Sequence, residues 1–292
     1  MPSPENTFQT VCLIFAVVLL LWDCVEVGRN DAANLINAVL GSRVLVRRRA
    51  ILIAGLAVVA GAVLSSDVVD TARKGIFNPL ALETIEAALA VYVSVYIVDT
   101  VLLYGYSAFG MPVSTTACLV FELLGACLAV NAVAVNWGKA GTVMLGIFCS
   151  IVLSGFAAFL IQRAARGAIK DKASSLSTLL LHGGWVGGGM AAGLLYFLLL
   201  KGMKNVGFVR RINAWLEVFD QRVEANISNA ALILLLWGVF AILIHLALVL
   251  FRRRAAKLLF PTLAVIGMIA MAFAFGQNDL ANCASPGLST VA

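Results

Sequence analysis

A heptapeptide closes the first apolar run of the chain and reads Gly28-Arg29-Asn30-Asp31-Ala32-Ala33-Asn34. A second copy closes the last apolar run and reads Gly276-Gln277-Asn278-Asp279-Leu280-Ala281-Asn282. Both copies fit the pattern G-x-N-D-x-A-N. Asp and Asn side chains are costly to leave in hydrocarbon, so they must line a cavity or be buried in protein. A polar motif that recurs beside two apolar runs predicts a helical membrane protein with an internal repeat.

The composition requires a lipid environment. The 292 residues are 62% hydrophobic and 12% charged, which is more apolar surface than a soluble core can hold. The net charge is +6, but Lys and Arg lie in short clusters between apolar runs, so they indicate topology rather than nucleic-acid binding. The six cysteines form no C-x-x-C pair and no Cys/His metal motif. We therefore exclude a soluble enzyme and expect a multi-pass protein of the cell membrane, specifically a bacterial inner membrane.

The expected fold is all-α and polytopic, with about eight transmembrane helices. By the positive-inside rule, the first motif ends a helix that runs inward and the second ends a helix that runs outward. The two copies would then be inverted-topology repeats, with the helices broken at the motifs and the binding site between them. The expected helices cover residues 11–28, 50–69, 82–106, 114–135, 140–162, 180–200, 229–251 and 258–276.

Three segments are expected along the chain. Residues 1–162 form the first transporter repeat, with five helices, and residues 163–228 form a cytoplasmic loop, a helix and an interfacial connector. Residues 229–292 begin a second, incomplete repeat. Within the connector, Trp215 and Phe219 are four residues apart and share one helical face, which favours a helix lying along the membrane interface.

The motif residues have the chemistry of a cation site. Gly28 and Gly276 allow the backbone to leave helical geometry, which would free carbonyl oxygens. Carbonyl, Asn amide and Asp carboxylate oxygens are the hard ligands that a desolvated sodium ion accepts, by analogy with other hard cations. A single copy would equally suit an ordinary helix cap at the membrane surface. The matching second copy favours the site.

A different motif, Gly110-Met111-Pro112-Val113-Ser114-Thr115-Thr116, directly precedes an expected helix. Proline in the first turn costs no hydrogen bond, and free N–H groups and partial positive charge at a helix N-terminus can hold an anion. An ordinary cap is the alternative. A multiply charged anion beside Asp31 and Asp279 would be repelled, so cations must bind with it. Asp99 and Glu122, inside apolar helices, are weaker candidates for a proton relay.

These residues together resemble the inorganic phosphate transporter family, often called PiT. The resemblance rests on the paired G-x-N-D-x-A-N motifs, on P-V-S-T-T, on the segment DTARKGI at residues 70–76 and on the apolar lead-in at residues 271–275. It implies symport of phosphate with sodium or protons by alternating access. Carried over, it implies phosphate binding by Asn30, Asp31, Ser114, Thr115, Thr116, Asn278 and Asp279, and ion binding by Asp31, Asn34, Asp279 and Asn282.

The chain departs from the family pattern in two ways. Arg29, Leu35, Gln277 and Cys283 vary the motifs, and Ala117 stands where a His commonly follows P-V-S-T-T. The chain also ends at Ala292, before the second P-S-T-T segment of the family, so we expect a C-terminally truncated member. The substitutions leave the Asn and Asp set intact, but they bear on ion selectivity and pH dependence.

We therefore predict a phosphate permease that is not an enzyme. It needs no cofactor or metal beyond the coupling ion, sodium or a proton. Its expected partners are inorganic phosphate and the lipid bilayer, without nucleic acid, and a homodimer stays open. The alternatives are a permease for sulfate or another oxyanion, a channel or sensor, and an intramembrane aspartyl protease that pairs Asp31 with Asp279.

Overall fold

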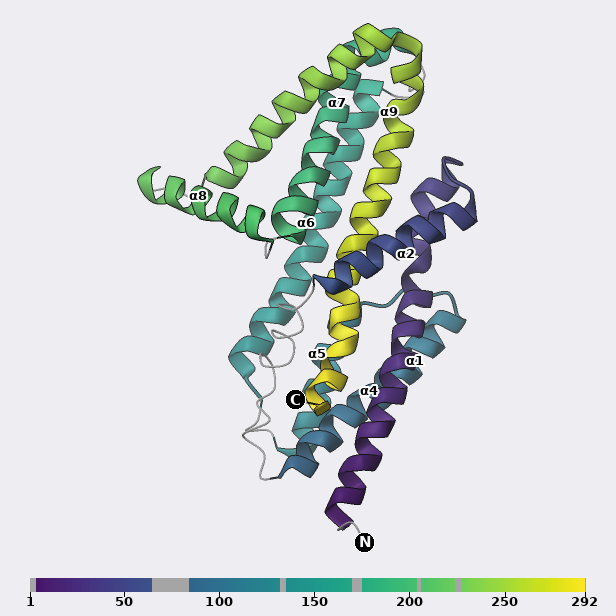
Figure 1. The fold of residues 1–292 in the computed structure, drawn as a ribbon, viewed down its shortest axis with the longest axis vertical. Coiled ribbons are helices and arrows are strands. Elements are labelled where there is room, and N and C mark those ends of the chain that lie inside the picture. The colour runs from purple at the N-terminus through teal and green to yellow at the C-terminus, as the bar shows by residue number, and fades with distance from the viewer. Residues whose placement is uncertain are drawn as a thin grey trace. The chain divides into compact units, whose positions relative to one another are not determined.

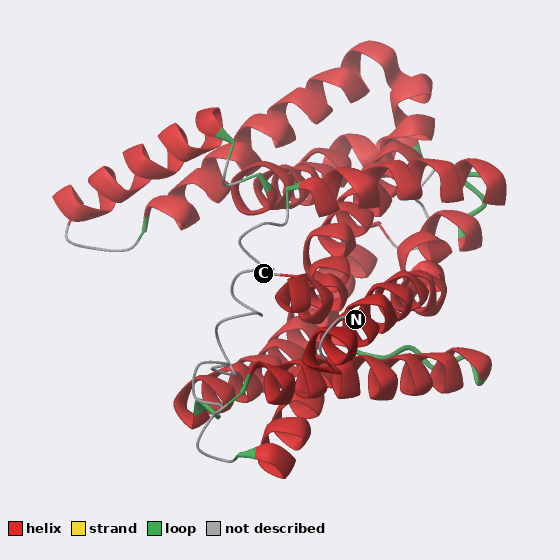
Figure 2. Cartoon of the chain, turned by 60° about the horizontal axis from the view of Figure 1, so that its bottom comes forward, coloured by secondary structure: helices red, strands yellow, loops and turns green. Residues whose placement is uncertain are grey.

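The structure is a computed structural model that describes residues 4–64, 84–131, 135–169, 175–203, 206–223 and 227–291. Within these ranges the chain consists of helices joined by loops, without an extended strand (Figure 2), as the apolar runs predict. The expected all-α fold is therefore confirmed. The segment at residues 70–76, which contributes to the family resemblance, lies outside the described residues.

Eight α-helices and one π-helical turn make up this part of the chain (Figure 1). Most expected helices are found within a few residues of the expected bounds. The larger differences are at the ends of three helices: the first continues to Gly41 rather than residue 28, the fifth to Ile169 rather than residue 162, and the last to Val291 rather than residue 276. The elements are α1 (Pro4–Gly41), α2 (Arg47–Val63), α4 (Ile85–Ala108), α5 (Thr115–Val130), α6 (Trp137–Ile169), α7 (Leu176–Tyr196), η3 (Phe197–Gly202), α8 (Gly207–Val223) and α9 (Ser228–Val291).

The chain divides into two compact units. Unit 1 comprises Met1–Leu35, Val59–Val152 and Phe275–Ala292, and unit 2 comprises Ile36–Val58 and Leu153–Ala274. Unit 1 therefore contains both G-x-N-D-x-A-N motifs and the P-V-S-T-T segment. Its apolar core lies where α4 packs on α5, around side chains such as Tyr92, Val120 and Leu123.

Four helices in the described residues are long and apolar enough to cross a membrane, and α5 is a shorter apolar helix. The four segments are Thr7–Gly41, Ile85–Ala108, Trp137–Ile169 and Ser228–Ala284. In α6, large apolar side chains such as Phe148, Ile151 and Phe156 are exposed. A soluble protein rarely leaves so continuous an apolar surface in water, so these side chains fit contact with lipid.

The motifs do not break their helices, contrary to the expectation. Residues 28–34 are helical within α1, and residues 276–282 are helical within α9. Glycine permits non-helical backbone but does not require it, since an apolar segment keeps its backbone hydrogen bonds most easily as a helix. The break in α9 occurs instead at Arg252, with φ 40° and ψ −110°, where Figure 1 shows α9 turning back on itself. The expected separation of helices 229–251 and 258–276 corresponds to this kink.

In unit 2, glycines let α7 pack closely against α9. A Cβ on Gly188 would lie 2.6 Å from the backbone nitrogen of Ala241, and one on Gly184 would lie 3.0 Å from the carbonyl oxygen of Ala241. Spacing small residues four apart is the usual way for membrane helices to approach backbone to backbone. Trp237 Nε1 also donates a 2.7 Å hydrogen bond to the carbonyl oxygen of Trp185 across the same contact.

The expected interfacial segment is the amphipathic helix α8. The rings of Trp215 and Phe219 stack with centroids 6.1 Å apart, so the prediction that they share one face is confirmed. Phe208 and Val218 are exposed as well. A helix with a stripe of exposed apolar side chains suits the headgroup boundary, and its position at the interface stays a prediction.

Candidate functional site

The turn between α4 and α5 is a Schellman motif, which ends α4 and sets up the start of α5. The N–H of Gly110 donates to the carbonyl of Ser107 at 3.1 Å, and the N–H of Met111 donates to the carbonyl of Tyr106 at 2.9 Å. Gly110 has φ +68°, a left-handed conformation in which a side chain is strained. Two satisfied carbonyls at the end of α4 therefore depend on a glycine at position 110.

Ser114 caps α5, because its Oγ accepts a 3.4 Å hydrogen bond from the N–H of Ala117. The expected helix start is thus found one residue later than predicted, with Thr115 as the first helical residue. Pro112 lies in the loop, two residues before the cap, rather than in the first turn. The first-turn N–H groups of α5 are those at which we expect an anion to bind.

Both the nitrogen and the oxygen of the Asn30 side-chain amide form hydrogen bonds with the end of α4 and the loop between α4 and α5. Its Nδ2 donates to Ser107 Oγ at 3.0 Å and to the carbonyl oxygen of Met111 at 2.9 Å. Its Oδ1 accepts from the N–H of Val113 at 2.9 Å. In this arrangement Asn30 holds the loop that leads into α5, so its side chain positions the P-V-S-T-T segment.

The second motif contacts the first turn of α5 directly. Thr115 Oγ1 donates a 2.8 Å hydrogen bond to Asp279 Oδ1, and Asn282 Nδ2 donates a 2.7 Å hydrogen bond to Thr116 Oγ1. Thr115 and Asn282 are buried, and Asp279 is half-buried. Residues more than 160 positions apart in sequence are thereby brought together at one helix N-terminus.

The remaining motif residues are more open. Asp31 Oδ1 accepts a 2.9 Å hydrogen bond from Asn34 Nδ2, one helical turn away, and Asn34 is exposed. Asp31 lies close enough to Asp279 to repel it electrostatically. Asn278 is exposed as well, and no hydrogen bond ties it to α5. The structure thus gathers Asn30, Thr115, Thr116, Asp279 and Asn282 by direct contacts and leaves Asn34 and Asn278 at the edge.

The two motif copies run in opposite directions within unit 1, as expected for inverted copies. Cys24 Sγ lies 3.6 Å from Cys283 Sγ, whereas Asp31, further along α1, interacts with Asp279, which comes earlier in α9. The same sense is visible in Figure 1, where α1 leaves the N-terminus and the last turns of α9 run back towards the C-terminus. Because α1 and the last turns of α9 run antiparallel, the two motifs lie at the same height along the two helix axes.

Polar residues outside the motifs also enter this region of unit 1. Asp23 and Glu26 on α1 are buried, as is Asp99 on α4. Glu26 pairs with Arg29 at 3.3 Å, and the Arg29 guanidinium lies 5.3 Å from the centroid of the Tyr104 ring. Asp99 was among the predicted functional residues, whereas Asp23 and Glu26 were not, although an acidic residue inside an apolar run is itself a signal of function.

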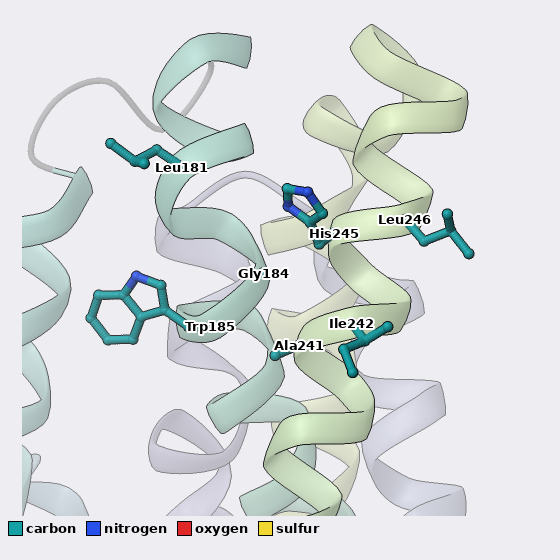
Figure 3. A pocket seen from close by; sticks show the side chains of 7 residues that line it. All are labelled: Leu181, Gly184, Trp185, Ala241, Ile242, His245 and Leu246. Carbon is teal, nitrogen blue, oxygen red and sulfur yellow. The ribbon is translucent and has the colours of Figure 1, made fainter.

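A hollow of about 350 Å³ lies elsewhere, between α7 and α9 of unit 2 (Figure 3). Its lining is apolar except for His245, and Figure 3 shows the Trp185 ring turned away from His245. His182 accepts a hydrogen bond from Trp185 Nε1 at 3.2 Å. Among the described residues, neither histidine belongs to a group of three side chains that could hold a metal ion. This hollow contains none of the predicted site residues.

Comparison with known proteins agrees with the motif analysis. The family model for the phosphate transporter family matches residues 27–292, which include both motifs. Relatives named "Putative phosphate permease" occur in Haemophilus influenzae, with 26% identity over 89% of this chain and 61% of the relative, and in Chlamydia muridarum, with 28% identity over 94% and 67%. A similar relative in Thermococcus kodakarensis is 28% identical over 89% of this chain and 62% of its own length. This chain thus spans less than two thirds of several relatives.

A solved structure, "The sodium-dependent phosphate transporter", has the same fold. It superimposes with a TM-score of 0.70 at 20% identity, covering 96% of this chain and 67% of the other. At this identity the likeness establishes the fold alone. The resemblance drawn from the motifs is confirmed by the family match. A transporter family also agrees with the prediction that the chain is not an enzyme and does not support the aspartyl protease alternative.

Proposed function

Because the chain belongs to the phosphate transporter family, we propose that it carries inorganic phosphate across a membrane together with a cation, by alternating access. The observation that carries this proposal is the meeting of Asp279 and Asn282 with Thr115 and Thr116. A carboxylate that could bind a cation there shares a hydrogen bond with a hydroxyl at the helix N-terminus suited to an anion. Anion and cation would then bind side by side.

The proposed phosphate contacts are the N–H groups and hydroxyls at the start of α5. Ser114, Thr115 and Thr116 offer hydroxyls there, and an α-helix N-terminus carries a partial positive charge. Asn30 contributes by holding the loop before them. In this structure the Thr115 hydroxyl donates its hydrogen bond to Asp279. When phosphate binds, this hydroxyl must either donate to phosphate instead, or stay on Asp279 while the neighbouring hydroxyls and N–H groups hold phosphate.

The proposed cation contacts are Asp31 and Asp279, with Asn34 and Asn282, while Asn278 stays a proposed phosphate contact. Phosphate next to two carboxylates is strongly repelled where water is scarce, at roughly 4 kcal/mol for each pair of unit charges 4 Å apart at an effective dielectric constant of 20. A bound sodium ion or proton removes this repulsion. Substrate and cation are therefore expected to raise each other's affinity, which is the basis of coupled transport.

The test is radiolabelled phosphate uptake into proteoliposomes with and without an inward sodium gradient. We expect uptake by the unmodified chain and a loss of at least tenfold in Asp31→Asn and in Asp279→Asn. Glu217→Gln is the matched control, because Glu217 is an exposed carboxyl of α8 outside the motifs, and this variant should transport normally. Uptake that requires a proton gradient instead would assign the coupling ion without changing the substrate.

Two results would contradict the proposal. Normal uptake by both Asp variants would remove the motifs from the mechanism. Uptake of sulfate in place of phosphate by folded protein would assign the oxyanion differently, since neutral hydroxyls and amides do not by themselves distinguish the two. A homodimer and a bacterial inner membrane stay predictions, testable by mass measurement in nanodiscs and by cell fractionation.

A further inference from the structure

Unit 1 contains a group of buried carboxyls that the motif site does not use. Asp23 of α1 is fully buried and Asp99 of α4 is 7% exposed. Both carboxyl oxygens of Asp23, both of Glu122 on α5 and Oδ1 of Asp99 are buried without a hydrogen-bond partner. An ionised carboxylate in such surroundings is costly unless it is paired or coordinates a cation. Three such groups together need an explanation.

The three carboxyls are close together. One carboxyl oxygen of Asp99, one of Glu122 and Sγ of Cys118 all lie within 4.8 Å of one another. Asp23 lies against Asp99, close enough for a direct interaction. Hard cations take oxygen ligands at about 2.3–2.6 Å, so two oxygens on opposite sides of one ion are about 5 Å apart. The carboxyl oxygens of Asp99 and Glu122 are therefore close enough to share a single small cation.

Among the described residues, no basic side chain forms an ion pair with any of these three carboxyls. The one ion pair there joins Arg29 to Glu26, and the Arg29 side chain is 45% exposed. The titratable groups that face the three carboxyls are acids and thiols, namely Glu26 from α1, Cys118 from α5 and Cys283 from α9. A bound cation or protons would supply the positive charge that these described side chains do not.

The cluster is separate from the motif site but lies beside it. Asp23 precedes Asp31 by eight residues, and Glu122 follows Thr115 by seven, so each is displaced by about two helical turns, or roughly 10–12 Å. Because α1 and α9 are antiparallel, moving back along α1 from Asp31 towards Asp23 and moving forward along α9 from Asp279 both lead away from the motif site in the same direction. The contact between Cys24 and Cys283 shows this, since Cys283 follows Asp279 in α9. The three carboxyls thus lie next to the proposed phosphate site, about two helical turns further along α1 and α5.

We propose that Asp23, Asp99 and Glu122 form a second cation-binding site, which takes a monovalent cation, Na+ or H+, and lies two helical turns from the G-x-N-D-x-A-N motifs. The proposal deepens the proposed function, because a cation bound there would be the one that travels with phosphate. A monovalent hard cation fits the available oxygens, whereas the Cys118 thiol is a poor ligand for it. The site supplies cation binding that does not depend on phosphate.

The test measures thermal unfolding of the full chain in nanodiscs, without phosphate, at pH 8. In wild type, replacing choline with Na+ should raise Tm, because a ligand that binds the native state stabilises it. The double variant Asp99→Asn/Glu122→Gln should lose the part of this Na+ response that comes from the cluster. It should also unfold at a higher Tm than wild type without Na+, since neutral side chains of the same shape relieve buried, unpaired charge. A purely structural role predicts the opposite change.

Controls separate the cluster from other carboxyls. Glu217→Gln removes an exposed carboxyl from α8 and should keep the full Na+ response. Asp31→Asn removes the motif carboxyl and should keep the part of the response that comes from the cluster. If protons occupy the site instead, the double variant should keep the full Na+ response of wild type, and the Tm of wild type should rise from pH 8 to pH 6 while that of the double variant does not.

Two outcomes overturn the proposal. One is a double variant whose Na+ and pH responses both equal those of wild type. The other is stabilisation by micromolar Zn2+ that Cys118→Ser abolishes, without a response to Na+ or pH. Phosphate is absent from these assays, so failure here is distinct from failure of the proposed function, which is reported by phosphate-dependent stabilisation and uptake.

Discussion

Asn30 should control phosphate binding without touching phosphate. Its amide makes three hydrogen bonds, to Ser107, Met111 and Val113. In Asn30→Leu all three are lost at nearly constant volume. Hydrogen bonds between membrane helices average about 0.6 kcal/mol each, so the loop loses about 2 kcal/mol. The bond to Met111 is exposed, so water can replace it and the higher values for buried bonds do not apply.

If the loop must be ordered for phosphate to bind, that free energy is subtracted from binding. About 2 kcal/mol corresponds to an approximately 30-fold rise in the Kd for phosphate. Ser107→Ala removes one of the three bonds and should raise the Kd only about threefold, or about 0.6 kcal/mol. The assay is binding of radiolabelled phosphate to protein in nanodiscs, combined with hydrogen exchange at residues 109–114.

The graded pair distinguishes positioning from direct contact. Positioning predicts that faster amide exchange in the loop accompanies the weaker binding, in the order wild type, Ser107→Ala, Asn30→Leu. A folded Asn30→Leu protein with wild-type exchange and a Kd within twofold of wild type would refute the reasoning. Weaker binding with unchanged exchange would instead indicate that Asn30 contacts phosphate.

Three further predictions concern packing, capping and helix direction. Gly188→Ala places a methyl group 2.6 Å from the Ala241 nitrogen, and overpacking of this kind destabilises a protein by about 1–3 kcal/mol. Thermal unfolding of this variant should therefore show a lower Tm than wild type. Gly193→Ala is the control, because the space around Gly193 is open, and it should not lower Tm. The Asp220 carboxylate caps the start of α9, because it accepts hydrogen bonds from the Ser228 hydroxyl at 2.6 Å and from the N–H groups of Ser228 and Ile227. The hydrogen bond from the Ser228 hydroxyl in particular holds the pKa of Asp220 below its ordinary value of 3.8. Stability from this cap is complete above the ordinary pKa and is lost as the pH falls through the lowered one, so the Tm difference between wild type and Asp220→Ala should be constant from pH 7 to 5 and shrink below pH 4. Mild oxidation should form a disulfide between Cys24 and Cys283, because their Sγ atoms are 3.6 Å apart and a disulfide bond needs about 2.05 Å. Mass spectrometry should find the linked peptide in oxidised wild type and not in Cys24→Ser. Its absence from oxidised wild type would contradict the antiparallel pairing of α1 with α9.

Local pattern was enough to identify most helices. Apolar runs of membrane length allow only one backbone conformation in lipid, so α4, α6 and both arms of α9 were expected close to their observed positions. The cap at Ser114 followed from its place before an apolar run. The paired N-D motifs indicated a transporter and, through their resemblance, a family that the comparison then confirmed.

Helix continuity through the motifs was not predictable from residue types. Gly28 and Gly276 can adopt many conformations, and only the packing of α1 and α9 in unit 1 selects the helical one. The kink at Arg252, by contrast, was marked in the sequence, because the charged run Arg252-Arg253-Arg254 separates the two apolar runs expected as helices 229–251 and 258–276.

By itself the sequence determined the membrane class, the duplicated motif and the identity of the polar residues, because hydropathy and repetition are properties of the chain alone. Tertiary structure decided which of these residues meet. Asp279 reaches Thr115 across 164 positions, and Asp23 lies against Asp99 across 76. Such contacts depend on the direction and rotation of whole helices, which are set by the sum of many packing contacts rather than by any one residue.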